Sequence, residues 1–232
     1  MSGDDRWTRI SGDFRTALAT ADVVSAIRSV AHDRLGCVAT SIMVRSGSGL
    51  MSLSGALAIA DVADGCQVTC GEGPSLLADT SELPVVCADL SRVDTRWARA
   101  GHDLCEIGVR SVAATPLRQG SARLGVISCY WSAPHVLTAE HYADLLAVAD
   151  IATELVLQHL ADTTVDLDAA VSGTALGSPI VQQAVGMLAE RYGIPVMEAQ
   201  IRLRAMAYSA EETLEVRAQR IVERDASDAD EA

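Results

Sequence analysis

The sequence predicts an α+β protein in which helices flank a sheet of hairpin strands and a small all-helical unit follows. Three observations lead to this fold class. Apolar residues recur at three- and four-residue intervals over 13–35 and again over 138–160. Short β-like runs between these segments are joined in pairs by glycine-containing turns. Beyond residue 178, three helical patterns occur in fewer than fifty residues.

The first helix is expected over 13–35, after an N-terminal tail over 1–12. β-like runs over 37–44 and 50–57 flank two turn glycines, which predicts an antiparallel hairpin. Residues 58–84 lack a clear period, so a loop with helical fragments is expected there. The next predicted elements are a buried strand over 85–88, a helix over 95–107 and strands over 111–116 and 123–131.

A longer helix is predicted over 138–160, with the Thr138 hydroxyl as its N-cap. Its apolar residues alternate at three and four positions, which is typical of a short coiled-coil seam and suggests a homodimer. The same pattern also fits a face that packs on the protein's own sheet. The seam positions are Leu145, Val148, Ala152, Leu155 and His159.

A linker is expected over 161–177, where the residues are small and polar and include glycine. Three helices are then predicted over 178–224. The first covers 179–192, the second runs from 195 to near 208, and a capping box at 209–212 opens the third. An acidic tail over 225–232 is expected to fray.

The composition fits a globular protein. The chain has 232 residues, 49% of them apolar, and a formal charge of −13. That length accommodates one sizeable domain and a small one. The sequence has no uninterrupted apolar window long enough to span a membrane, and its N-terminus is acidic and polar, unlike a secretory signal. We therefore expect a cytoplasmic protein without membrane contacts.

The six cysteines lie mostly within apolar runs and are expected to be reduced core thiols. Cys66 and Cys70 are four positions apart, but the sequence around them does not complete a four-ligand zinc set. No cofactor is identified, and no Ser-His-Asp or phosphate-loop pattern is evident. We therefore expect that the protein is not an enzyme.

One group of motifs in the first 160 residues resembles a GAF domain. The resemblance covers roughly 13–160 and implies a mixed or antiparallel sheet with flanking helices, and a pocket for an unknown small-molecule ligand. The motifs stand at 71–75, 83–90, 97, 104–112, 116–118 and 124–127. The pocket residues that we expect are Cys66, Cys70, Trp97, His102, Cys105 and Arg110.

The C-terminal unit over 178–224 resembles an ANTAR domain. The resemblance rests on residues 180–194 and on apolar positions in the two following helices, such as Leu203, Leu214 and Ala218. It implies a three-helix module of a transcription antitermination regulator that binds paired hairpins in leader RNA, usually as a dimer. Signal transfer from the GAF sensor is expected through the helix over 138–160.

RNA binding requires cations near phosphates, and aromatic or amide groups that meet unpaired bases. In the C-terminal unit these residue types close the first helix, flank the apolar face of the second, and add two amides. The candidate RNA contacts are Gln182, Gln183, Arg191, Tyr192, Arg202 and Arg204.

Two alternatives stay open. Val185 stands where related modules commonly have lysine, and Glu211 and Glu212 would repel phosphates, which favours a regulator that has lost RNA binding and acts through a protein partner. Some GAF proteins reduce methionine sulfoxide with cysteines, and Cys66 and Cys70 would be the candidates for that activity here.

Overall fold

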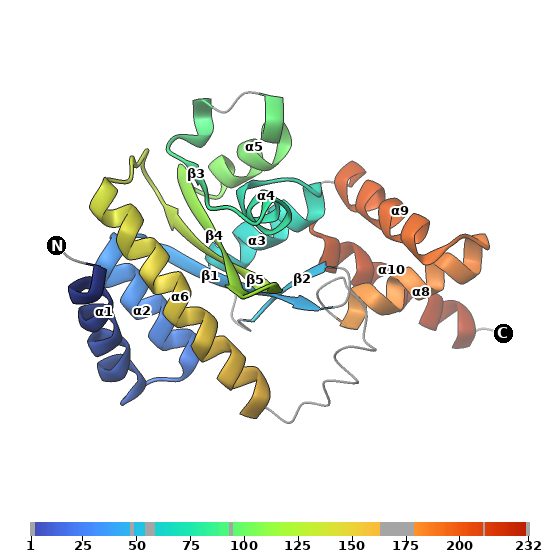
Figure 1. Cartoon of the computed structure of the whole chain (residues 1–232). Coiled ribbons are helices and arrows are strands. Elements are labelled where there is room, and N and C mark those ends of the chain that lie inside the picture. Colours follow the sequence, from blue (N-terminus) through green and yellow to red (C-terminus); the bar gives the residue numbers. More distant parts are fainter. Residues whose placement is uncertain are drawn as a thin grey trace.

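The computed structural model describes residues 3–46, 49–53, 59–92, 95–162, 179–210 and 212–230. The predicted linker, apart from residues 161 and 162, lies outside these ranges, as do Ser178 and Glu211. Within the described residues the fold is α+β, as predicted, with a five-stranded antiparallel sheet in the order β2-β1-β5-β4-β3 (Figure 1). The strands are β1 (Ala39–Ser46), β2 (Gly49–Ser52), β3 (Val85–Cys87), β4 (Ser111–Gln119) and β5 (Ala122–Trp131).

β5 is the central strand and is buried on both faces. Its side chains alternate, as strand geometry requires. Ile127, Cys129 and Trp131 belong to the core on one face of the sheet, whereas Val126 and Tyr130 belong to cores on the other. Both hairpins predicted from the glycine turns are therefore present, and β1 of the first hairpin pairs with β5 of the second.

Three helices cover the first face: α1 (Gly3–Leu18), α2 (Val23–Leu35) and α6 (Ala139–Asp162) (Figure 1). The single helix predicted over 13–35 is two helices, because Asp22 caps α2 by accepting a hydrogen bond from the Ser25 amide at 3.0 Å. The predicted N-terminal tail is wrong from residue 3 onward. α1 occupies it, and Ile10 is fully buried against the sheet domain.

α6 begins after Thr138, whose hydroxyl caps the His141 amide as expected. Three of the five predicted seam residues are buried within the chain, whereas Leu155 and His159 are partly exposed. Leu145, Val148 and Ala152 have no exposed surface and pack in the core formed with α1, α2 and the sheet. The alternative interpretation of this face, packing on the protein's own sheet, is the one observed.

The second face carries α3 (Ile59–Cys70), α4 (Pro74–Ser81) and α5 (Ala98–Glu106), with short 3₁₀ turns at Leu90–Arg92 and Thr95–Trp97. The stretch over 58–84, predicted to be a loop with helical fragments, is thus mostly two helices from residue 59 onward. Its periodicity was obscured because α3 buries polar as well as apolar residues: Asp64, Gln67 and Thr69 are all buried.

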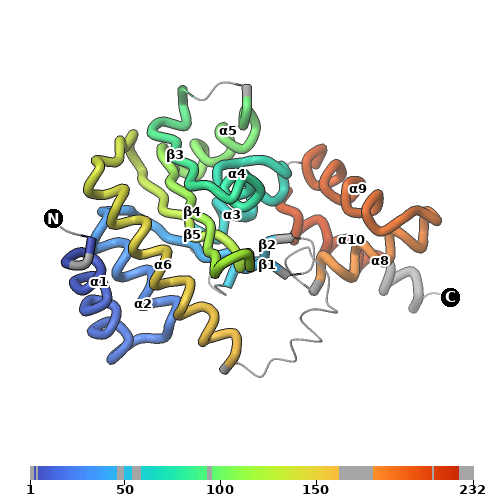
Figure 2. The backbone as a smooth tube through the Cα atoms, in the orientation of Figure 1, coloured from blue at the N-terminus to red at the C-terminus, as the bar shows by residue number. Residues whose placement is uncertain are grey.

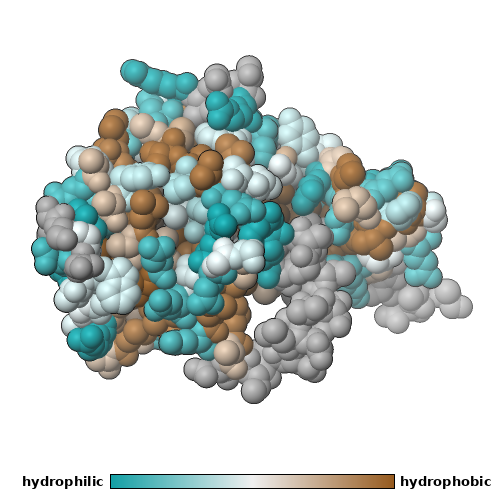
Figure 3. Space-filling model, viewed as in Figure 1, coloured by the Kyte–Doolittle hydropathy of each residue, from teal (hydrophilic) through white to brown (hydrophobic). Residues whose placement is uncertain are grey.

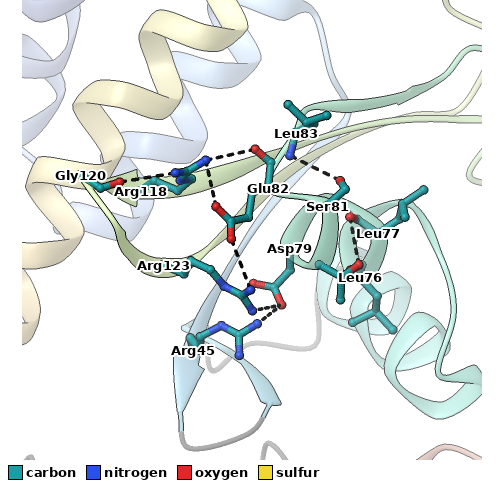
Figure 4. Close-up of polar contacts among 11 residues, drawn as sticks. Arg45, Leu76, Leu77, Asp79, Ser81, Glu82, Leu83, Arg118, Gly120 and Arg123 are labelled. Carbon is teal, nitrogen blue, oxygen red and sulfur yellow. Dashed lines mark hydrogen bonds and ion pairs between the residues drawn. The ribbon is translucent and has the colours of Figure 1, made fainter.

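Ion pairs tie the end of α4 to the sheet. Asp79 pairs with Arg45 of β1 and Arg123 of β5, and Glu82 pairs with Arg118 at 3.1 Å and with Arg123 at 3.5 Å (Figure 4). The Asp79 side chain is buried, which limits screening by solvent. This cluster holds α4 against the strands beneath it.

The last three helices are α8 (Pro179–Tyr192), α9 (Val196–Ser209) and α10 (Leu214–Asp230), which Figure 2 traces at the red end of the chain. They share a core of their own, centred on Leu188, Leu203 and Leu214. The predicted capping box at 209–212 is wrong: Ser209 ends α9 and its hydroxyl donates to the Met206 carbonyl. The Thr213 hydroxyl caps α10 instead. α10 also runs into the predicted tail, to Asp230.

Candidate functional site

A polar network fills the space between α3, the start of α4 and the sheet. Tyr130 donates a hydrogen bond to Asp64 Oδ1 at 2.7 Å, and Ser41 donates to the same oxygen at 2.9 Å. Gln67 donates to the Tyr130 hydroxyl at 3.1 Å. Ser75 and Ser128 are joined at 2.8 Å. All six side chains are buried, so this is a polar interior within an otherwise apolar core.

Asp64 is the ionisable centre of this network. Burial raises its pKa to about 7, and the hydrogen bonds from Tyr130 and Ser41 offset only part of that effect. Burial and the adjacent Asp64 also raise the pKa of Tyr130. Within the described residues, Asp64 Oδ2 has no hydrogen-bond partner. The carboxyl therefore has one oxygen that remains able to bind a further donor.

Gly73 lets the chain pass close to this network. It has φ +142°, and a Cβ added there would lie 2.5 Å from Gln67 Oε1. The same Gln67 oxygen accepts a hydrogen bond from the Ser75 amide at 2.9 Å. The glycine thus allows the Gln67 amide to fasten the start of α4 to α3.

Of the six predicted pocket residues, the structure brings together Cys66 and Cys70. Both line a cavity of about 230 Å³ between α3, α5 and the C-terminal helices, with Tyr208, Glu212 and Thr213 on its far side. Trp97 lines a different groove. His102 is exposed, Cys105 is half-buried, and the Arg110 backbone bridges Leu90 and Trp131.

The two cavity cysteines are neutral thiols near pH 7. Burial and the Asp103 carboxylate raise the pKa of Cys66 to about 11 and that of Cys70 to about 12. Cys70 donates to Asp103 at 3.6 Å. Since the thiolate is the nucleophilic form, this environment suppresses their reactivity. Among the described residues, no group of three or more His, Cys, Asp or Glu side chains is arranged to hold a metal ion.

α3 also contacts the C-terminal helices. The Thr69 hydroxyl accepts a hydrogen bond from the Leu214 amide at 3.1 Å, in the first turn of α10. Val68 packs against the core of the three helices. Nearby, the Arg99 guanidinium lies over the Tyr208 ring at 5.1 Å and is held by Asp103 at 3.0 Å. α3 therefore contacts two regions. Asp64 and Gln67 belong to the polar interior, and Val68 and Thr69 contact the C-terminal unit.

Two of the predicted RNA contacts meet at the exposed end of the C-terminal unit. The Arg202 guanidinium carbon is 3.8 Å from the centroid of the Tyr192 ring. Arg191 and Gln183 are also exposed, whereas Gln182 and Arg204 are partly buried. Figure 3 shows apolar residues at the surface of this unit. Those of α9 are Val196, Met197, Ile201 and Tyr208, each at least half exposed.

Val185 and Glu212, two of the residues that argued against RNA binding, do not present a free apolar or acidic group to solvent. Val185 is buried in the three-helix core, so its position does not face solvent. Glu212 pairs with Arg220 and lies 3.8 Å from Arg217, so arginines of α10 offset its charge. Glu211 is outside the described residues. Sequence spacing could not reveal these pairings, because Glu212 precedes the helix that neutralises it.

Asp64, Gln67, Ser41 and Tyr130 were missed by sequence reasoning. The available signal was a pair of polar residues, Asp64 and Gln67, three positions apart on the buried side of a helix.

The helices that the structure describes include none with the length and hydropathy of a membrane span.

In a comparison with known protein families, the GAF domain matches residues 20–165 of the chain. No curated protein matches the chain. Similar solved structures include a domain of a sensor histidine kinase from Sinorhizobium meliloti, with 15% identity, 60% of this chain and 92% of the other covered, and a TM-score of 0.49.

Two further solved structures are similar. One is the GAF domain of a phosphoenolpyruvate-protein phosphotransferase from Coxiella burnetii, which is 14% identical. The match covers 70% of this chain and 98% of that domain, with a TM-score of 0.49. A free methionine-R-sulfoxide reductase from Neisseria meningitidis, solved with its substrate, has 15% identity, 65% and 89% coverage, and a TM-score of 0.44.

Proposed function

The chain belongs to the GAF domain family, and from that premise we propose that it is a transcription antitermination regulator in which the GAF sensor domain controls a C-terminal ANTAR domain. The ANTAR domain, formed by α8, α9 and α10, binds paired hairpins in leader RNA. The observation that carries this proposal is the stacked pair of Tyr192 and Arg202 on the exposed surface of the unit.

This pair suits single-stranded bases in hairpin loops. An unpaired base can stack on an aromatic ring or on a guanidinium plane, and arginine also binds phosphate in a bidentate manner. Arg191 adds a second exposed cation next to Tyr192 in the chain. The buried position of Val185 and the pairing of Glu212 remove two of the arguments against RNA binding.

Control by the sensor domain is expected to pass through α3. A small molecule that hydrogen-bonds would bind Asp64 Oδ2, the oxygen without a partner among the described residues. A movement of α3 would then change the contact between Thr69 and Leu214, where α3 meets the first turn of α10. This route replaces the one expected through α6, whose apolar face packs on α1, α2 and the sheet.

We expect the protein to be cytoplasmic. We also expect a homodimer, because when one module has bound its hairpin, the effective concentration of the second module at the second hairpin is raised. Because Leu145, Val148 and Ala152 of α6 are buried within the chain, we place the dimer contact elsewhere on the protein. We also expect no enzymatic activity, since Cys66 and Cys70 are held as neutral thiols.

The test is a titration of the full chain against a two-hairpin leader RNA, with the same RNA lacking one hairpin as the matched ligand. Tight binding to the paired form, weakened by Arg202→Ala and by Arg191→Ala, supports the proposal. The second candidate function is regulation through a protein partner, which the exposed Met197 and Ile201 favour. Absence of RNA binding by a folded chain would move the assignment to that alternative.

A further inference from the structure

Two buried thiols that the proposed function does not use meet at one hydroxyl. Cys37 lies just before β1, and Cys129 lies in β5. The Cys37 sulfur is 3.2 Å from Thr40 Oγ1, and the same oxygen is 4.0 Å from the Cys129 sulfur. Strand pairing fixes this arrangement, because Thr40 is opposite Cys129 in the β1–β5 ladder. Both sulfurs therefore contact the same hydroxyl.

The two sulfurs differ in their affinity for a proton. Hydrogen bonds from Cys129 and Thr40, together with the charge of His32, lower the pKa of Cys37 to about 7. The pKa of Cys129 is raised well above its ordinary value, because it is the hydrogen-bonded partner of Cys37 and is fully buried. Near neutral pH, Cys37 is therefore the more readily ionised of the two thiols.

A groove leads to Cys37 from the surface. It has a volume of about 340 Å³ and runs between α2, the start of β1 and α3. Arg28 and His32 line it on the α2 side, and Arg28 faces Asp61 of α3 at 3.9 Å. Because Cys37 itself is only 1% exposed, a reactant that reaches it must be small.

Three further cysteines have surroundings that disfavour the thiolate form. Burial raises the pKa of Cys66, Cys70 and Cys87, so these side chains remain thiols near neutral pH. Oxidation depends on the thiolate form and on access. The lowered pKa of Cys37 and its place on the groove therefore favour it over these three thiols as the site of first attack.

We propose that Cys37 and Cys129 form a peroxide-reactive dithiol pair that closes to an intramolecular disulfide. The Cys37 thiolate attacks one oxygen of a hydroperoxide, the O–O bond breaks, and the departing oxygen leaves as an alcohol or water after taking a proton. Cys37 is then a sulfenic acid. The Cys129 sulfur attacks the Cys37 sulfur, an S–S bond forms, and the hydroxide leaves as water with the proton of Cys129.

This reaction transfers two electrons from the two thiols to the peroxide and needs no other co-reactant. The disulfide would link the start of β1 to β5. This part of β1 is connected to α3 through Arg28, which donates a hydrogen bond to the Thr40 carbonyl at 3.1 Å and faces Asp61 of α3. The dithiol pair is a second input to the sensor domain. It does not depend on RNA binding, so either proposal can fail alone.

The test is peroxide treatment of the reduced, full-length chain, followed by thiol counting and mass spectrometry of a non-reducing digest. We expect two thiols to be lost and one peptide pair, linked through Cys37 and Cys129. The alkylation rate of Cys37 should rise with pH through a midpoint near 7, because the thiolate reacts. Retention of a reduced Cys37 at the peroxide dose that oxidises other cysteines would overturn the proposal.

Single variants assign the order of events. Cys129→Ser should stop at a Cys37 sulfenic acid that dimedone traps, whereas Cys37→Ser should give no adduct at Cys129. Cys87→Ser, at another buried cysteine, is the matched control and should leave the disulfide unchanged. An unchanged yield of oxidised thiols in folded Cys37→Ser would contradict the assignment. If a variant does not fold, the linked peptide from the unaltered chain still decides the question.

Discussion

The Thr69 hydroxyl of the sensor domain accepts a hydrogen bond from the Leu214 backbone amide of the C-terminal unit, 145 residues away in the chain. The first amides of a helix have no partner within the helix itself. α3 therefore completes the N-terminus of α10, and the two units share a buried polar contact as well as the packing of Val68.

Replacing Thr69 with Val keeps the shape of the side chain and removes its oxygen. The buried Leu214 amide would lose its acceptor, at a cost of about 1–3 kcal/mol. We expect faster hydrogen exchange in the first turn of α10, with the sheet unaffected. Thr80→Val is the control, since the exposed Thr80 hydroxyl bonds only carbonyls of its own helix. Equal exchange in the two variants would show that the contact does not hold α10.

Asp64 should make stability depend on pH. Its pKa in the folded protein is about 7, above the ordinary value of 3.8, so the folded state holds a proton that the unfolded state releases. Stability contributed by the protonated form is therefore lost as pH rises from about 4 to about 7. Urea unfolding of Asp64→Asn should show a smaller decline over this interval than the unaltered chain.

The control for this measurement is Asp33→Asn, which alters an exposed carboxylate on α2. Its pH profile should parallel that of the unaltered chain. If Asp64→Asn also paralleled it, Asp64 would be ionised in the folded protein throughout the interval, and the polar interior would need a different description.

Gly73→Ala should destabilise the sensor domain. The added Cβ would meet the Gln67 amide at 2.5 Å, and φ +142° is unfavourable for alanine. A thermal scan should give a clearly lower Tm. Gly65→Ala is a matched control within α3, because nothing lies within 4 Å of its added Cβ and alanine favours a helix by about 1 kcal/mol over glycine. That variant should unfold at the same temperature or higher.

Sequence periodicity predicted the elements whose apolar residues share one face. The helix over 179–192 matches α8 at both ends, and the strands over 111–116 and 123–131 lie within β4 and β5. It missed the break at Asp22, although an aspartate that caps the amide three residues later is a local helix-start signal. It missed α3 because the buried face of that helix contains Asp64 and Gln67, whose partners come from β1, β5 and α4.

The RNA contacts remain a prediction. Residue chemistry selected Tyr192 and Arg202 as candidates, and the structure shows that the two side chains are in contact. The pocket residues were chosen from motif positions, and they spread over separate surfaces because α3, the loop before α5 and α5 itself face different neighbours. Pairing of Glu212 with Arg220 requires the path of the chain into α10, which residue spacing does not supply.

The measurement that tests the account most directly is the affinity of the full chain for a two-hairpin leader RNA as a function of salt concentration. Phosphate contacts make the logarithm of the affinity fall linearly with the logarithm of the salt concentration. Arg202→Ala and Arg191→Ala should each weaken binding and reduce the slope by about 1. Arg92→Ala, at an 86% exposed side chain of the sensor domain, is the control and should change neither quantity. Binding that is absent, or that is insensitive to salt and to both arginines, would contradict the account.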